Sequence, residues 1–155
     1  MKKFAMVAGL AIAAALPLGA TADDQHIVVP ADGLKWGPAS PALPKGAQMA
    51  VLFGDPTKEG QFAYRLKFPA GYKVAAHMHP NDENVTVISG TFNIGTGDKL
   101  DETKGEALKP GGFLHMPKGT HHYAWFTEET ITQSNGVGPV GITYINPADD
   151  PRKTN

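Results

Sequence analysis

Glycine and proline interrupt this chain too often for long helices to form. The 155 residues include 18 glycines and 13 prolines, which separate short apolar runs along most of the length. In the run over residues 61–68, the larger apolar side chains fall on every second residue: Phe62, Tyr64, Leu66 and Phe68. Such alternation indicates a half-buried strand, and short strands bounded by turn residues predict an all-β sandwich or barrel.

The N-terminal segment predicts export. Two lysines precede an apolar run over residues 4–16, and small residues follow at positions 20 and 22. This order is typical of a secretory signal peptide, here residues 1–22, which would be cleaved after Ala22. The run is shorter than the roughly 18 residues that a membrane-spanning helix needs. We therefore expect a periplasmic or extracellular protein that makes no membrane contact after cleavage.

The mature chain, residues 23–155, has the length of one domain. Prolines recur within residues 23–47, which we interpret as an extended N-terminal arm anchored by Trp36. Residues 48–147 are expected to form the barrel, and residues 148–155 a frayed polar tail. The formal net charge of −1 gives no basic footprint for nucleic acid. Because the chain has no cysteine, nitrogen and oxygen atoms must hold any metal.

Turn signals divide the barrel segment into short expected strands. They cover residues 49–53, 61–68, 73–79, 84–89, 91–95, 112–116, 121–127, 130–135 and 140–145. We expect strands 84–89 and 91–95 to pair as a hairpin around Ser89-Gly90. Residues 96–107 are polar and are expected to form a loop.

His77 and His79 carry the strongest chemical signal in the chain. Residues two apart on a strand point the same way, so both imidazoles are expected to enter one space. Glu83 follows across a short loop, so its carboxylate can face the same space from the next strand. His122, on a distant strand, is the candidate for a third histidine. Three imidazoles and a carboxylate suit one divalent transition metal ion per chain: Mn, Fe, Zn, Ni or Cu.

The spacing of these residues resembles the two sequence motifs of the cupin superfamily. The first motif, G-x5-H-x-H-x3-E-x6-G, is matched by Gly71, His77, His79, Glu83 and Gly90. The second, G-x5-P-x-G-x2-H, is matched by Gly111, Pro117, Gly119 and His122. The resemblance implies a double-stranded β-helix, or jelly-roll barrel, with a metal ion inside. The chain is most similar to small secreted or periplasmic single-domain cupins, and its ligand set to that of the ChrR-type cupin domain.

One position departs from the cupin pattern. The second motif usually ends in asparagine four residues after its histidine, where this chain has Phe126. We expect a drier interior there, with Phe126, Phe62 and Tyr64 as candidate substrate contacts. The candidates for a catalytic acid or base are Asp82, His115 and Tyr64.

Strand parity predicts which side chains face the interior. An apolar cavity around the metal is expected, as small-molecule sites usually are. The outer face would carry a set of apolar side chains: Val74, Ala76, Met78, Tyr123 and Trp125. Because so much apolar surface requires a cover, from the arm or from a second subunit, we expect a homodimer.

The resemblance implies a metal-dependent enzyme acting on a small oxygenated or carboxylated compound, since dioxygenases, decarboxylases and isomerases occur among cupins. Four protein ligands would leave two positions of an octahedral ion open. The alternative is a non-catalytic module that binds or senses a metal or ligand, as the ChrR similarity suggests. A titratable residue within hydrogen-bond reach of an open metal position would favour the enzyme.

Overall fold

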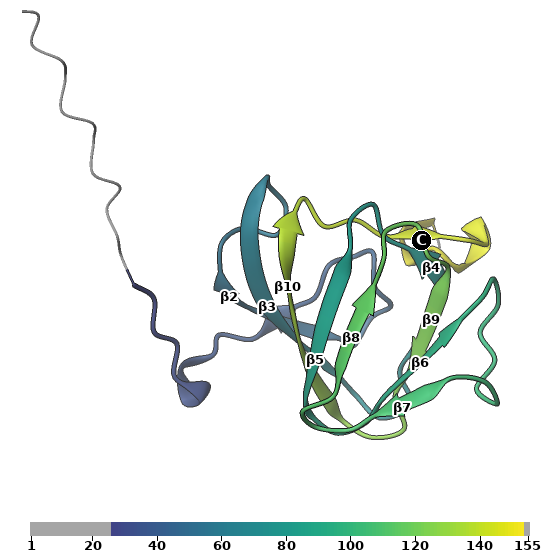
Figure 1. Cartoon of the computed structure of the whole chain (residues 1–155), viewed down its shortest axis with the longest axis horizontal. Coiled ribbons are helices and arrows are strands. Elements are labelled where there is room, and N and C mark those ends of the chain that lie inside the picture. The colour runs from purple at the N-terminus through teal and green to yellow at the C-terminus, as the bar shows by residue number, and fades with distance from the viewer. Residues whose placement is uncertain (1–25, 154–155) are drawn as a thin grey trace, which may run out of the picture.

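Two antiparallel β-sheets face each other across a shared interior (Figure 1). The computed structural model describes residues 26–153, and the predicted signal peptide, residues 1–22, lies outside them. The expected all-β architecture is confirmed. Each sheet joins strands that are distant in the sequence, so residues from both halves of the chain meet in the interior.

The six-stranded sheet has the order β1-β2-β3-β10-β5-β8, and the five-stranded sheet the order β11-β4-β9-β6-β7. The first comprises β1 (Gly37–Pro38), β2 (Gln48–Phe53), β3 (Gly60–Phe68), β10 (Thr130–Gly138), β5 (Glu83–Ser89) and β8 (Phe113–Met116). The second comprises β11 (Thr143–Tyr144), β4 (Lys73–Met78), β9 (His122–Trp125), β6 (Phe92–Thr96) and β7 (Glu106–Leu108). Short 3-10 helices are η1 (Ala31–Gly33), η2 (Pro147–Asp149) and η3 (Pro151–Lys153). Within residues 26–153, no helix has the length and apolar character needed to cross a membrane.

The predicted hairpin at Ser89-Gly90 is wrong, because the chain changes sheets there. β5 pairs with β10 and β8, whereas β6 pairs with β9 and β7. Gly90 has a φ of 77°, and a Cβ at this position would collide with the backbone of Glu129. The Thr91 N–H donates to Thr130 Oγ1 at 3.1 Å and holds the crossing against β10. A turn signal locates a reversal of the chain but does not identify the partner of the strand that follows.

A register shift in β4 corrects one predicted side-chain direction. Val74 lies opposite Ala124 of β9, and His77 lies opposite His122, so the pairing shifts by one residue between them. Such a bulge reverses the side-chain alternation along one strand. Val74, which strand parity placed on the outer face, is therefore buried and lines the interior together with His77.

The outer face of the second sheet is covered within the chain. Tyr123 and Trp125 are buried together with Ala76, and Leu100 and Ile145 pack on them. The Tyr123 hydroxyl lies 3.2 Å from the Asp101 carbonyl and 3.3 Å from that of Lys104, which fastens the 97–105 loop over this face. The cover that the homodimer was expected to supply is thus provided by a loop, and the homodimer stays a prediction.

Phe126 joins the two sheets at the centre of the core. Its side chain is 1% exposed and stacks on Phe68 of β3, with the ring centroids 4.0 Å apart. It also stacks on Phe92 of β6 at 5.5 Å. The aromatic ring therefore fills the space between the sheets, in keeping with the dry interior expected at this position.

The N-terminal arm is tied to the barrel over residues 36–44. β1 of the arm pairs with β2, and Lys67 Nζ lies 4.5 Å from the ring centre of Trp36. The Tyr72 hydroxyl donates to the Pro44 carbonyl at 2.5 Å, and the Tyr144 hydroxyl donates to the Ala42 carbonyl at 2.8 Å. The arm is therefore part of the wall of the barrel, in addition to being extended.

The polar tail is ordered up to Lys153, which corrects the expectation of fraying. Asp150 is buried, and its carboxylate accepts two hydrogen bonds from the Arg152 guanidinium, at 2.7 and 2.8 Å. Arg152 also donates to the Ile142 carbonyl at 3.2 Å. The composition of the tail is polar, as predicted, and Asp150 and Arg152 bind each other and the barrel.

Candidate metal centre

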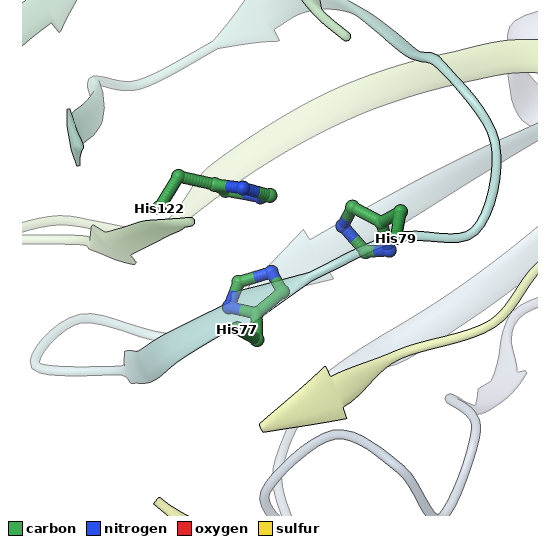
Figure 2. Close-up of side chains that lie close together, drawn as sticks. All are labelled: His77, His79 and His122. Carbon is green, nitrogen blue, oxygen red and sulfur yellow. The ribbon is translucent and has the colours of Figure 1, made fainter. Parts of the chain in front are cut away.

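Three histidines converge at one end of the interior (Figure 2). His77 lies on β4, His79 follows the end of that strand, and His122 begins β9. One ligand nitrogen from each imidazole lies within 4.8 Å of the other two. The predicted convergence of His77 and His79, two residues apart, holds because the shift in β4 comes before His77. These histidines form a group that could hold a metal ion.

Backbone carbonyls fix the orientation of all three imidazoles. Nδ1 of His77 lies 2.7 Å from the Ala75 carbonyl oxygen. The corresponding distances are 2.6 Å from His79 to Gly141 and 2.9 Å from His122 to Thr120. A carbonyl can only accept, so each Nδ1 carries a proton and each Nε2 is the nitrogen left to face a metal ion. This is the arrangement that histidine ligands of metals adopt, with the second nitrogen held by an outer partner.

His77 is poised as a neutral donor. Burial, followed by the charges of His122 and His79, lowers the pKa of His77 to about 3. His77 is therefore uncharged at any physiological pH and offers its lone pair without first losing a proton. Among residues 26–153, the Nε2 atom of His79 is buried without a hydrogen-bond partner. A buried polar atom without a partner is costly, and a metal ion at this point would satisfy it.

Glu83 brings the negative charge to this group. Its carboxylate oxygens lie 3.7 Å from His79 Nε2 and 3.5 Å from His122 Nε2. Burial by itself raises the pKa of Glu83, but the hydrogen bond to His122 and the charges of the histidines outweigh burial and lower it. The carboxylate is thus ionised beside the three imidazoles, and the donor set fits a divalent cation.

A cavity of about 240 Å³ opens onto these four side chains. Its walls are mostly apolar and include Leu66, Phe68, Val74, Val85 and Phe126. This volume is slightly below the usual range for small-molecule sites, which begins near 300 Å³. The cavity therefore has room for a compact organic molecule beside the histidines.

Small hydroxyl side chains on β10 make room for the cavity and give it a polar stripe. Thr132 and Ser134 are buried, line the cavity and lie opposite Leu66 and Tyr64 of β3. Burial is the main cause that raises the pKa of the Tyr64 hydroxyl, and the charge of Glu83 adds to it. A hydrogen bond with Ser134 offsets only part of this increase. Tyr64 therefore keeps its proton at physiological pH and can donate a hydrogen bond inside the cavity.

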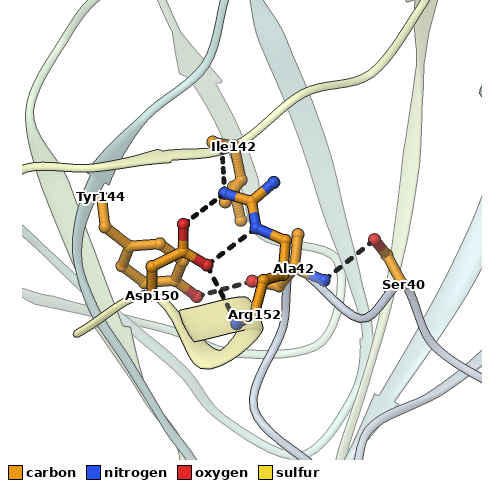
Figure 3. A network of polar contacts seen from close by, with 6 residues as sticks. All are labelled: Ser40, Ala42, Ile142, Tyr144, Asp150 and Arg152. Carbon is orange, nitrogen blue, oxygen red and sulfur yellow. Dashed lines mark hydrogen bonds and ion pairs between the residues drawn. The ribbon is translucent and has the colours of Figure 1, made fainter. Parts of the chain in front are cut away.

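The exposed lining residues mark the mouth of the cavity. Ser40 comes from the arm, Thr57 and Val140 from connecting segments, and Arg152 from the tail. Figure 3 shows how the arm and the tail meet around Tyr144 and Ile142. The two ends of the described chain therefore shape the entrance.

Two of the three candidate substrate contacts line the main cavity, and the third lies beside it. Tyr64 and Phe126 line the main cavity. Phe62 is buried but lines a separate hollow of about 30 Å³, behind His79 and Glu83. Phe62 stacks on Tyr64 with the ring centroids 5.3 Å apart, so it supports the tyrosine ring from outside the cavity.

Asp82 and His115 lie outside the cavity lining, contrary to their selection as possible acids or bases. Asp82 is exposed, and its carboxylate accepts a hydrogen bond of 2.9 Å from the backbone of Lys118. His115 is exposed on β8, where its Nδ1 lies 2.9 Å from the Asn84 side-chain oxygen. His115 points away from the interior because of the strand alternation of β8, whereas Asp82 lies in the loop that precedes β5.

Sequence reasoning missed Thr132, Ser134 and Arg152 as lining residues. The first two carried a usable signal, because they alternate with larger residues on the predicted strand 130–135 and share one face. Arg152 gave none: it lies in a polar tail, and only the fold brings that tail to the cavity.

The sequence of the chain agrees with this architecture. The family described as the ChrR cupin-like domain matches residues 24–141. The chain belongs to this family. Its two sheets and histidine group are therefore those of a cupin, as the two motifs implied. No curated protein matches the chain.

Several solved structures share the fold at low sequence identity. The polyketide cyclase RemF from Streptomyces resistomycificus has a TM-score of 0.64 and 15% identity, covering 82% of this cupin and 90% of that chain. An acetylacetone dioxygenase from Acinetobacter johnsonii has a TM-score of 0.59 and 15% identity, covering 78% of each chain. KdgF from Halomonas sp. has a TM-score of 0.55 and 19% identity, covering 73% of this chain and 94% of that chain. At these identities the likeness establishes the fold alone.

Proposed function

We propose that this protein is an exported, metal-dependent cupin enzyme that acts on a small oxygenated or carboxylated compound. The observation that carries the proposal is the convergence of three imidazoles, each with Nδ1 held by a carbonyl, at the head of an apolar cavity. A site built only for packing would not leave His79 Nε2 buried without a partner.

The proposed ligands are His77, His79, Glu83 and His122, holding one divalent ion per chain. Nitrogen and carboxylate donors suit Mn, Fe, Zn, Ni and Cu, and the choice among them depends on supply as well as on affinity. One carboxylate leaves a divalent ion with an uncompensated positive charge, which favours an anionic or oxygen-rich ligand. When bound, such an ion can polarise a carbonyl group, lower the pKa of water and orient a substrate.

The side chains of the cavity have distinct roles in this proposal. The apolar walls exclude water and hold the carbon skeleton of the substrate. Tyr64, kept protonated by burial, donates a hydrogen bond to a substrate oxygen. Because Asp82 and His115 lie outside the cavity, Tyr64 is the candidate for proton transfer. The chemistry would be that of a dioxygenase, a decarboxylase or an isomerase, classes that include the acetylacetone dioxygenase among the structural neighbours.

A second candidate function is a binding or sensing module without turnover. The family description, which refers to ChrR, favours it. So does the scarcity of titratable groups: among the described lining residues, Tyr64 is the candidate for proton exchange once the three histidines and Glu83 are assigned to the metal ion. In this case the metal would stabilise the fold or hold a signal molecule.

Turnover distinguishes the two functions. The mature chain, residues 23–155, is loaded with Fe(II), Mn(II), Ni(II), Cu(II) or Zn(II) and mixed with acetylacetone and with short keto acids. Oxygen uptake, carbon dioxide release and product formation are followed. The enzyme proposal predicts many turnovers per metal ion, reduced in Tyr64→Phe. Saturable binding of these compounds with no product for any metal would instead establish the binding module.

Export and assembly belong to the same proposal. The segment over residues 1–22 would direct the chain to the periplasm or beyond, and a homodimer is the proposed assembly. Fractionation of cells that express the full chain tests the first, and sedimentation of the mature protein tests the second.

A further inference from the structure

Arg152 brings a permanent positive charge to the mouth of the cavity. When the three histidines are set aside, Arg152 and Glu83 are the charged side chains among the described residues that line the cavity. Glu83 lies at the histidine end, whereas Arg152 is 44% exposed and belongs to the tail. The cavity therefore has a cationic group at its entrance and a proposed metal ion at its head, with apolar walls between them.

The Arg152 guanidinium is held rigidly but is not fully used. Its Nε and Nη2 atoms bind the Asp150 carboxylate at 2.7 and 2.8 Å, and Nη2 also donates to the Ile142 carbonyl (Figure 3). Nη1 makes no hydrogen bond with residues 26–153. Its two N–H groups are thus fixed in direction and available to an incoming acceptor. Guanidinium groups suit carboxylates particularly well, because two parallel N–H groups match two oxygens.

A short segment connects Arg152 to the candidate metal centre. His79 Nδ1 binds the Gly141 carbonyl at 2.6 Å, and Arg152 binds the carbonyl of the next residue, Ile142. Neighbouring Cα atoms are about 3.8 Å apart, so the carbonyls that hold the imidazole and the guanidinium belong to adjacent residues of one short segment. Both side chains line the same cavity, so one ligand in it can contact both ends.

We propose that Arg152 binds a carboxylate at the far end of a ligand whose near end binds the metal ion at His77, His79, Glu83 and His122. The ligand class is a short aliphatic compound with a metal-binding oxygen group at one end and a carboxylate at the other. This inference rests on the proposed metal site, and it specifies the substrate or signal class for either function. Asp150 orients the guanidinium and also offsets part of its charge. The proposed contact between Arg152 and the ligand carboxylate therefore depends on hydrogen-bond geometry as well as on charge attraction.

The test uses two pairs of hydroxamates, which bind metal ions through two oxygens. Glutaric and adipic monohydroxamates end in a carboxylate, whereas pentanohydroxamate and hexanohydroxamate end in a methyl group and have the same chain lengths. Mature protein loaded with Co(II) is titrated with each compound, and the dissociation constants are obtained from the visible spectrum of cobalt. For the wild type, we expect at least one carboxylate-ended compound to bind roughly tenfold more tightly than its methyl-ended partner.

The variants are Arg152→Gln and, as a matched control, Lys153→Gln, which removes the same charge from the exposed neighbouring residue. We expect the preference for the carboxylate to disappear in Arg152→Gln and to persist in Lys153→Gln. If Arg152 only holds the tail in place, Arg152→Gln will change the affinities of both members of a pair by the same factor, and the proposal fails. Equal binding of both members by the wild type also overturns it. Failure to bind Co(II) at all would instead contradict the proposed metal site.

Discussion

His77 and His122 face each other as direct partners across β4 and β9, with their ring centroids 4.2 Å apart. This pairing exists because the register shifts by one residue between Val74 and His77. The shift turns both His77 and Val74 inward, so the metal-binding group and the apolar wall beside it arise from one irregularity. The placement of His77 against His122 is therefore set by the pairing of two strands rather than by loops.

Replacement of His122 should abolish stabilisation by metal ions, whereas replacement of its neighbour should not. His121 is partly exposed and pairs with Asp98 at 2.5 Å, away from the cavity. A ligand that binds only the folded state raises the melting temperature. We expect added Zn(II) or Ni(II) to raise the melting temperature of wild type and His121→Ala, but not of His122→Ala. Equal shifts in both variants, measured by scanning calorimetry, would exclude His122 as a ligand.

Glu83→Gln should weaken metal binding without abolishing it. The amide keeps the size of the side chain but removes the negative charge beside the imidazoles of His79 and His122. We expect the dissociation constant for the metal ion, measured in competition with a chromogenic chelator, to rise by at least about tenfold. Loss of residues that only hydrogen-bond to metal ligands already has an effect of about this size. Glu129→Gln, an exposed change of the same chemistry, is the control. An unchanged constant in Glu83→Gln would leave the histidines as the whole ligand set.

Gly90→Ala should destabilise the fold more than Gly71→Ala. Both glycines have positive φ, 77° and 79°, so either alanine incurs a backbone cost of about 1–2 kcal/mol. An added Cβ at Gly71 meets no atom within 4 Å, whereas at Gly90 it collides with the backbone of Glu129. We expect urea denaturation to give a clearly larger loss of unfolding free energy for Gly90→Ala. Equal losses would mean that the crossing between the sheets tolerates expansion.

Phe126→Ala should cost about 3–5 kcal/mol of unfolding free energy, the range for an aromatic ring removed from a core. The ring stacks on both Phe68 and Phe92 and so connects the two sheets. Phe113→Ala, at a side chain that is 59% exposed, is the control and should change stability by less than about 0.5 kcal/mol. A small effect at Phe126, measured by chemical denaturation, would show that the sheets are held together elsewhere.

The sequence predicted the parts of this protein that depend on local periodicity. The alternation over residues 61–68 and the spacing of His77 and His79 follow from the two-residue repeat of a strand. The glycine and proline positions located most turns. The strand alternation and the turn positions together were sufficient to predict the all-β fold and the convergence of His77 and His79 in one interior.

Features that depend on pairing between distant strands escaped prediction. The shift that turns Val74 inward is a property of the ladder between β4 and β9, and nothing in residues 73–79 marks it. The crossing at Gly90 has the same turn residues as a hairpin. Arg152 reaches the cavity because Asp150 and Ile142 hold it there, contacts that exist only after folding.

The metal content of the mature protein is the decisive measurement. Protein purified from the compartment in which it resides is analysed for transition metals beside a His77→Ala, His79→Ala double variant prepared in the same way. The proposed function predicts about one divalent transition metal ion per wild-type chain and none in the variant. A wild type that carries no metal and cannot be loaded with Mn, Fe, Ni, Cu or Zn would contradict it and leave the cavity as a site for apolar ligands.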